Sequence, residues 1–360
     1  MSMDELQRPA ASADGKRMAS TWTGQRNARG DWRPEAAITL PPIASWPPRP
    51  VATLKWLFGF PGYLWPMNSL WLAISLVTWF FLTPALESMR FFEPWWIGIL
   101  LARNYALVLL IAGGLHLYLY VLKGQGETRK FTNKPLSTGS KRSLFGKRFF
   151  FGDQVRDNML RTLCVGVPVV TAYEAVSYWL FSNGHIGFMG AAVSPTWFWA
   201  WFAILIFIAP VIHAVHFYCV HRLLHTKLLY KKFHCVHHLN VEVGPWSGLA
   251  MHPVEQLLYF STVVVQWLLA SHPVNTLFQI HIALFPSFFG HSGFEKVMVG
   301  RRFGLDAGNY FHYLHHKYFE CNYGGSLAPL DVLFGTFHDG SDTAQAAMRE
   351  RMQSRRGADA

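Results

Sequence analysis

Charged residues are scarce in this sequence. They make up 15% of its 360 residues, whereas soluble domains contain roughly 25%. Hydrophobic residues supply 51% and aromatic residues 16%, which argues against a soluble, disordered or fibrous protein. Acidic residues are the scarcer charge: 21 Asp and Glu stand against 32 Lys and Arg, a net charge of +11. In so apolar a chain an excess of positive charge is typical of contact with anionic lipid headgroups.

Several sequence signals are also missing. The four cysteines (Cys164, Cys219, Cys235 and Cys321) show no CxxC spacing, which argues against a disulfide framework. No basic stripe with interleaved aromatic residues occurs, so we expect no nucleic-acid partner. The first residues lack the charged and apolar regions of a signal peptide, and we expect no cleavage before the first apolar stretch.

Four apolar stretches are long enough to cross a membrane, because a spanning helix needs about 20 mainly apolar residues. They cover 64–86, 95–122, 159–181 and 197–220. Short links join the first to the second and the third to the fourth, which predicts two antiparallel hairpins in an all-α integral membrane protein. The later stretches 253–270 and 274–289 are short and broken by His and Pro. We expect re-entrant or interfacial helices there, with a fifth and sixth span as the alternative.

The distribution of Lys and Arg predicts the orientation. Residues 123–148 hold eight of them and residues 182–196 hold none, so the positive-inside rule places the connection 123–156 and both termini in the cytosol. We divide the chain into a mobile tail over 1–62, a membrane-embedded domain over 63–338 and a polar C-terminal tail over 339–360. Histidine motifs at 213–338 follow the fourth span and predict a helical cap on the cytosolic side.

Histidine is the unusual residue, since 14 of the 17 fall between His213 and His316. They form one HxxxH motif and two HxxHH motifs. The motif residues are His221 and His225, then His234, His237 and His238, then His312, His315 and His316. A spacing of three or four residues places imidazoles on one face of a helix.

One such motif alone is compatible with surface histidines, but three on one side of a membrane predict a metal centre. Eight imidazoles are too many for one ion, so we expect two ions, each with an open position for dioxygen or water. Imidazole suits iron, zinc, copper and nickel. Hydrolytic zinc sites typically use three ligands, a water and a nearby carboxylate base, whereas the three motifs contain no carboxylate. The pattern therefore favours redox chemistry.

Four strings carry a resemblance to a known family. They read YCVHRLLHTKLLYKKFHCVHH, MHPVEQLLYF, HSGFE and FHYLHHKYFECNYGGSLAPLDVLFGT. Over residues 213–336 the chain thus resembles the fatty acid hydroxylase and sterol desaturase superfamily. The resemblance implies a membrane-bound non-haem diiron oxidoreductase that uses O2 to hydroxylate or desaturate a sterol, fatty acyl or related lipid in lipid biosynthesis.

The resemblance also implies cofactors and partners. These are two Fe ions, a lipid substrate and a separate electron donor, either cytochrome b5-like or ferredoxin-like with its reductase, because the chain has no HPGG haem loop. The membrane implied is a bacterial inner membrane or the endoplasmic reticulum.

The site residues follow by position from the resemblance. The eight motif histidines are the implied metal ligands, and His252 and His291 match family positions for additional ligands or for partners of ligands. Glu255 is expected either to hold a ligand imidazole or to pair with the Lys231 and Lys232 region. Asp331 is expected either to orient a ligand imidazole or to serve as a helix cap or turn residue. An acidic residue that the family often carries before its first motif is replaced here by His213 and His216, and His216 forms an alternative HxxxxH pair with His221. Beyond the metal centre no catalytic residue is predicted.

The main alternative is a metal transporter or a metal-binding membrane protein without oxidase chemistry. Transport sites normally lie at mid-depth between helices, whereas these motifs follow the last span and are flanked by Arg222, Lys227 and Lys231. A bis-histidine haem carrier would leave the second HxxHH motif unexplained. Arg103 and Glu174 lie within predicted spans, and we expect them either to serve function or to pair with each other.

Overall fold

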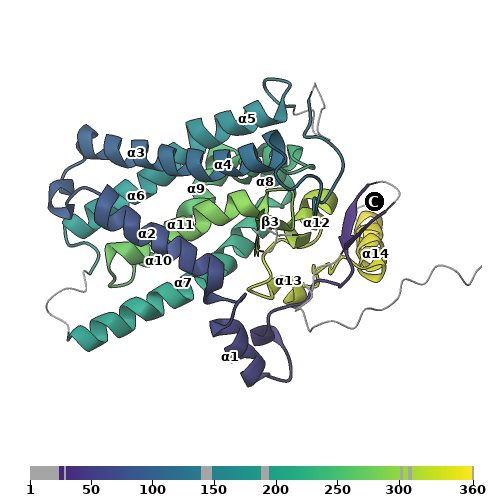
Figure 1. Ribbon diagram of the computed structural model, residues 1–360, viewed down its shortest axis with the longest axis horizontal. Coiled ribbons are helices and arrows are strands. Elements are labelled where there is room, and N and C mark those ends of the chain that lie inside the picture. The colour runs from purple at the N-terminus through teal and green to yellow at the C-terminus, as the bar shows by residue number, and fades with distance from the viewer. Residues whose placement is uncertain are drawn as a thin grey trace, which may run out of the picture.

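The computed structural model describes residues 24–27, 30–138, 148–187, 194–300, 303–306 and 310–358. The molecule is elongated and mostly helical, with long helices toward one end and α8 and α12 toward the other (Figure 1). Two short antiparallel hairpins occur among the described residues. They pair β1 (Gly24–Arg26) with β2 (Trp32–Pro34), and β3 (Lys296–Val299) with β4 (Phe303–Asp306).

Four helices are long and apolar enough to cross a membrane, as predicted. They run over Leu64–Leu82, Pro94–Val121, Gln154–Ser182 and Pro195–Leu224. Their regular α-helical parts are α2 (Ser69–Leu82), α3 (Pro94–Val108) with α4 (Gly114–His116), α5 (Gln154–Arg161) with α6 (Val167–Ser182), and α7 (Pro195–Leu224). Wider π-type turns complete them at Leu64–Asn68, Leu109–Gly113, Leu117–Val121 and Thr162–Gly166.

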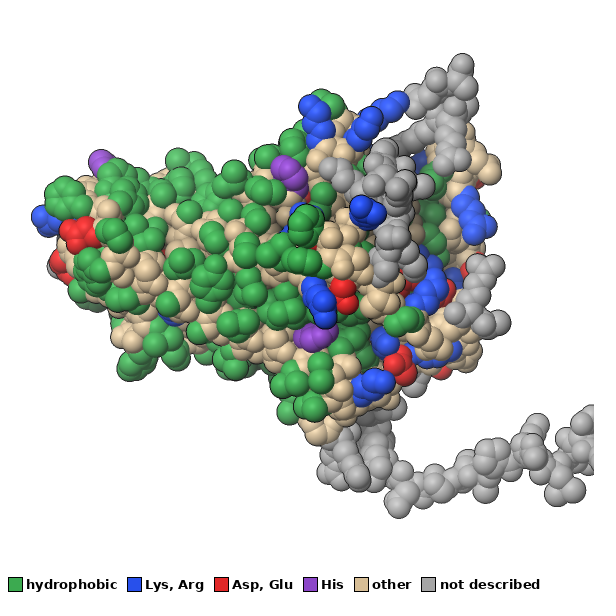
Figure 2. All heavy atoms as spheres, turned by 90° about the horizontal axis from the view of Figure 1, so that it is seen from above, with side chains coloured by type: hydrophobic (Ala, Val, Ile, Leu, Met, Phe, Trp, Pro, Cys, Tyr) green, Lys and Arg blue, Asp and Glu red, His purple; other side chains and the backbone are tan. Residues whose placement is uncertain are grey.

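The sequence explains where these helices begin. Pro94 and Pro195 occupy first-turn positions, where the missing N–H costs nothing. Asp153 accepts a hydrogen bond from the backbone N–H of Arg156, and Ser194 accepts one from that of Trp197, which caps α5 and α7. On the face shown in Figure 2, apolar side chains cover the end of the molecule that holds the long helices, and Lys and Arg side chains gather mainly toward the opposite end. The prediction of an all-α membrane protein is confirmed.

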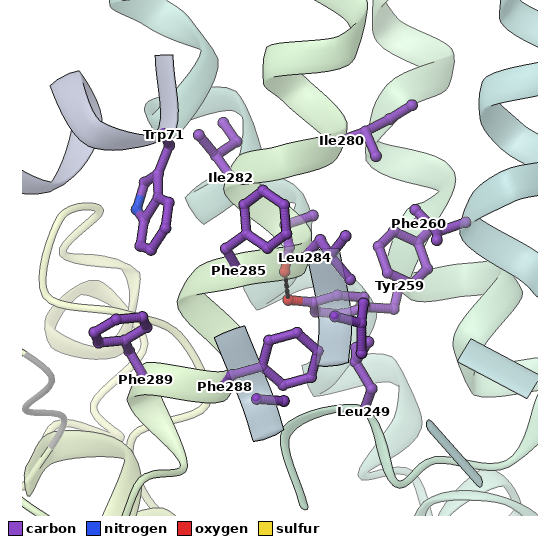
Figure 3. Close-up of a cluster of buried hydrophobic side chains, with 14 of the residues drawn as sticks. Trp71, Leu249, Tyr259, Phe260, Ile280, Ile282, Leu284, Phe285, Phe288 and Phe289 are labelled. Atoms are coloured by element: carbon purple, nitrogen blue, oxygen red, sulfur yellow. Dashed lines mark hydrogen bonds between the residues drawn. The ribbon is translucent and has the colours of Figure 1, made fainter. Parts of the chain in front are cut away.

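Helix α11 (Pro273–Gly290) is the centre of the apolar core. It contacts α2, α6 and α7, and nearly all of its residues are buried. Trp71 packs on Phe285 and Phe289, with ring centroids 5.5 and 5.4 Å apart (Figure 3). An interfacial helix would expose one face to lipid headgroups, so of the two predictions for 274–289 the interfacial helix is wrong. A re-entrant helix enclosed by the protein stays a prediction. The preceding stretch forms α9 (Pro253–Phe260), a 3-10 turn (Ser261–Val263) and α10 (Val264–Trp267).

Arg103 on α3 and Glu174 on α6 form a buried ion pair within the bundle. Asn104 also donates a hydrogen bond to Glu174 at 3.0 Å. Of the two expectations for Arg103 and Glu174, pairing is the one observed. A buried charge without its partner would be strongly destabilising, so the pair holds α3 against α6.

The histidine-rich end is built from short elements. These are α8 (Lys227–Lys232), 3-10 turns at His234–Leu239 and Pro245–Leu249, α12 (Tyr310–Tyr318), α13 (Leu330–Leu333) and α14 (Asp342–Ala358). The spacing of the second histidine motif predicted an α-helix with its imidazoles on one face. The motif lies instead on a separate 3-10 turn, because the chain turns at His225 and again at Phe233.

The description of both ends as tails needs correction for the described residues. Residues 24–27 and 30–62 include the β1–β2 hairpin, 3-10 turn Pro42–Ala44 and α1 (Pro50–Phe58). Trp32 is 5% exposed and contacts Phe131 and Tyr310, so this part is not a mobile tail. The remainder of the predicted tail, 1–23 and 28–29, lies outside the described residues. The C-terminal segment forms the polar helix α14, with Met348 buried.

Candidate metal centre

The three histidine motifs come together although they lie on separate elements. His221 is in the last turn of α7 and His225 is the residue after its end. The second motif occupies the 3-10 turn His234–Leu239, and the third lies on α12. His291, the residue that ends α11, joins them.

Nine imidazoles form two groups, and within each group the candidate ligand atoms all lie within 4.8 Å of one another. Group 1 consists of His221, His225, His234, His238 and His315; group 2 consists of His237, His291, His312 and His316. The Nε2 atoms approach at 3.0 to 3.2 Å in group 1. They approach at 3.0 to 3.3 Å in group 2.

Each HxxHH motif contributes to both groups. On α12, His312 and His316 are four residues apart and share a face, so both enter group 2. His315 points into group 1. In the second motif His234 and His238 enter group 1 and His237 enters group 2. The two groups adjoin, because the rings of His238 and His316 have centroids 4.8 Å apart.

Hydrogen-bond acceptors next to Nδ1 orient four of the imidazoles. The Nδ1 atom of His234 lies 2.7 Å from Glu255 Oε1. Backbone carbonyls of Tyr323, Cys321 and Ser287 lie 2.6 to 2.8 Å from Nδ1 of His221, His315 and His291, respectively. An Nδ1–H that donates to such an acceptor leaves the Nε2 lone pair free to face the centre of the group.

Burial favours the neutral form of seven imidazoles in the two groups. It lowers the pKa of His291 to about 4 and of His315 to about 3. Burial and neighbouring imidazoles also hold the pKa well below its ordinary value in several other histidines. These are His225, His237, His238, His312 and His316. Neutral imidazole is the form that binds metal ions.

An apolar cavity of about 250 Å³ adjoins both groups. Its lining includes His221 and His312, and it extends between α7, α9 and α11 past Phe217, Tyr259 and Ile282. A chamber of this composition is suited to an apolar segment rather than to a polar metabolite.

The structure places the other candidate residues differently. His216 Nε2 lies 2.9 Å from the hydroxyl of Ser261 and belongs to neither group, so the alternative pair with His221 does not form. His252 caps α9, accepting from the N–H of Val254, and is likewise outside the groups.

Glu255 contacts a candidate ligand as expected, but Asp331 does not. Asp331 accepts hydrogen bonds from the backbone N–H groups of Tyr323 and Gly324 and from the hydroxyl of Thr336. It thereby shapes the loop whose Tyr323 carbonyl faces His221. Its effect on the imidazole is indirect.

Sequence reasoning did not find the carbonyl acceptors at Tyr323, Cys321 and Ser287. Every residue carries a carbonyl, so no side-chain signal marks them. His338 belongs to no motif, yet it is 2% exposed and its Nδ1 accepts a hydrogen bond from the N–H of Gly340. No spacing signal separates it from a surface histidine.

The fold and site define a helical membrane protein with a buried, imidazole-rich candidate metal centre. Residues 203–336 match the Fatty acid hydroxylase family. The chain is 31% identical over 180 residues to a Delta(7)-sterol-C5(6)-desaturase of Nicotiana tabacum, covering 48% of this chain and 63% of the relative. It is 31% identical over 187 residues to the very-long-chain aldehyde decarbonylase GL1-11 of Oryza sativa subsp. indica, covering 50% of this chain and 67% of the relative.

A putative methylsterol monooxygenase of Dictyostelium discoideum is 31% identical over 128 residues, 35% of this chain and 47% of the relative. No solved structure matches the chain. The chain belongs to the fatty acid hydroxylase and sterol desaturase superfamily, as its histidine motifs predicted.

Proposed function

We propose that this protein is a membrane-bound non-haem diiron oxidoreductase that uses O2 to hydroxylate or desaturate a lipid. The observation that carries the proposal is the pair of buried imidazole groups beside an apolar cavity. The names of the sterol desaturase, aldehyde decarbonylase and methylsterol monooxygenase relatives support a lipid substrate.

The two groups fit a pair of metal ions. His221 and His234 have acceptors at Nδ1, yet their Nε2 atoms lie 3.0 Å apart. With both Nδ1–H groups donating, two lone pairs face each other, and a cation between them relieves the repulsion. Ligands 2.0–2.1 Å from one ion lie about 2.9–3.4 Å from each other at octahedral or tetrahedral angles, which agrees with the observed spacing. We propose all nine group members as ligands, five for one ion and four for the other.

The chain's own residues would position the reaction. Two irons held by the groups would supply dioxygen reduction and removal of hydrogen from a lipid C–H bond. Glu255 and the carbonyls behind the rings would hold the imidazoles in orientation. Apolar lining side chains such as Phe217 and the buried Tyr259 would exclude water from the cavity. A lipid segment in the cavity would lie against His221 and His312.

The proposal also includes the orientation of the protein in the membrane and a separate electron donor. We propose that residues 63–338 form the membrane-embedded enzyme, with the histidine groups and both termini in the cytosol and a separate protein as the electron donor. The positive-inside rule supports this orientation. Of the basic connection, Lys141, Arg142 and Lys147 lie outside the described residues.

Metal analysis and lipid analysis test the proposal together. Purified protein should hold about two irons per chain, matching two groups of imidazoles. Mass spectrometry of lipids from deletion and complemented strains should show one lipid that gains oxygen or loses two hydrogens only when the protein is present. His234→Ala and His312→Ala should abolish this product, whereas the exposed His185→Ala serves as the matched control. Stoichiometric zinc without iron, after iron-replete anaerobic handling, would refute the redox function.

A further inference from the structure

His213 lines the cavity without using its hydrogen-bonding capacity. Its Nδ1 atom is buried and unbonded, and the ring makes no hydrogen bond to another described residue. Its neighbours are aromatic: Phe217, stacked at 6.1 Å, and Tyr259, edge-on at 5.7 Å. The Tyr259 hydroxyl already donates to the carbonyl of Ala283 at 2.6 Å, the dashed bond in Figure 3. The Nε2 atom is absent from the buried unbonded atoms, so it keeps accessible surface in a side chain that lines the cavity. A cavity ligand is therefore the natural hydrogen-bond partner for Nε2.

The position of His213 relates it to the candidate metal centre. Pro210, His213, Phe217 and His221 all line the cavity from one face of α7. Eight residues separate His213 from His221, which corresponds to about 12 Å along a helix axis. Phe217 lies between them, with its ring 4.9 Å from that of His221. The cavity therefore has a polar side chain, the His213 imidazole, about two helical turns from group 1.

We propose that His213 binds a hydroxyl group of the lipid, so that the reacting carbon lies against the histidine groups about two helical turns away. A neutral imidazole presents one donor and one acceptor, and a hydroxyl can pair with either nitrogen in either tautomer. The substrate class is then a lipid that already carries a hydroxyl rather than a plain hydrocarbon. This inference rests on the proposed function for the identity of the reacting carbon, but the binding step is separate from it.

His216 provides a matched control on the same helix. It is three residues from His213, its Nε2 lies 2.9 Å from the Ser261 hydroxyl, and it is absent from the cavity lining. The substitutions His213→Phe and His216→Phe both replace an imidazole by an apolar ring. They differ in whether the replaced side chain lines the cavity. His213→Gln retains a hydrogen-bonding group at the cavity position.

The experiment measures binding of tritiated hexadecan-1-ol and n-hexadecane to the purified full chain in micelles, with protein-free micelles as the blank. The native protein and His216→Phe should bind the alcohol about five- to tenfold more tightly than the alkane, as expected for one hydrogen bond. His213→Phe should bind both probes equally, and His213→Gln should keep part of the preference. Iron content should be unchanged in every variant, because neither position belongs to a histidine group.

Three results would overturn the proposal: no preference in the native protein, an unchanged preference in His213→Phe, or loss of iron in His213→Phe, which would make His213 a ligand. Binding is measured without turnover. A protein that holds no iron and oxidises no lipid would therefore refute the proposed function while leaving the hydroxyl preference readable.

Discussion

Glu255 is the carboxylate in direct contact with a candidate metal ligand, through His234 Nδ1 at 2.7 Å, and it is 2% exposed. Glu255→Ala should lower iron affinity or activity roughly 10- to 100-fold, the usual cost of losing the partner that orients a ligand imidazole. Iron content and product yield measure this. Glu127→Ala is the matched control, since the Glu127 side chain is 54% exposed and contacts Lys130 rather than a histidine of either group. Equal iron and yield in both variants would contradict the orienting role.

The depressed pKa values of His291 and His315 predict the acid sensitivity of the iron-free protein. Their folded pKa values are about 4 and about 3, against 6.5 when unperturbed. Below pH 6.5 these two histidines bind protons in the unfolded chain but stay neutral in the folded chain. The free energy of unfolding therefore falls as pH falls. Each histidine should cost about 2 kcal/mol at pH 5.

Thermal unfolding of the iron-free protein in detergent, at pH 7.5 and pH 5, measures this loss. The double variant His291→Asn and His315→Asn should show a smaller decrease in Tm between the two pH values. A Tm in the native protein that does not change between pH 7.5 and 5 would show that these imidazoles are not held neutral by folding.

At the residue scale, the sequence predicted the eight motif histidines that meet at the site, but not how they divide. Spacing does not say which group each of His234, His237 and His238 enters. The turn geometry at His234–Leu239 decides it by directing His237 toward His291 and His312. The carbonyls of Tyr323 and Cys321 depend on loop conformations set by contacts such as those of Asp331, which no local pattern encodes.

At the scale of elements, the four spanning helices were predictable because length and apolarity identify them directly. The predicted 64–86 and 197–220 correspond to the observed Leu64–Leu82 and Pro195–Leu224. The role of α11 was not predictable, since a short apolar helix interrupted by His281 and Pro286 has the same composition at an interface or in a core. Tertiary contacts bond the imidazole that interrupts it: His281 Nδ1 lies 2.8 Å from the Ser75 hydroxyl.

The central position of α11 predicts a contrast between two phenylalanines. Phe285 on α11 is fully buried, whereas Phe81 on α2 is 79% exposed. Phe285→Ala should lower the free energy of unfolding by about 3–5 kcal/mol through the cavity it leaves. Phe81→Ala should have little effect, because its ring faces outward. Thermal unfolding of both variants in the same detergent measures the difference, and equal Tm values would contradict a core role for α11.

At the scale of the whole molecule, the proposed orientation places the histidine groups, the connection 123–156 and both termini on one side of the membrane. On the face shown in Figure 2, Lys and Arg side chains gather mainly toward the end of the molecule opposite the long apolar helices. Four spans joined as two hairpins require the links on either side of a span to face opposite compartments. Lys134, before the third span, and Gly184, after it, therefore report the two sides, and both residues are described and exposed.

Single-cysteine labelling in intact cells tests this arrangement. Cys164 and Cys219 are exposed and must first be replaced by serine, whereas Cys235 and Cys321 are buried. Burial also raises the pKa of the Cys321 thiol, which suppresses the reactive thiolate. Gly184→Cys should react with a membrane-impermeant maleimide from outside, while Lys134→Cys should react only after permeabilisation, because the basic connection stays in the cytosol. Labelling of both from the same side would refute the four-span topology, and labelling of Lys134→Cys alone from outside would invert it.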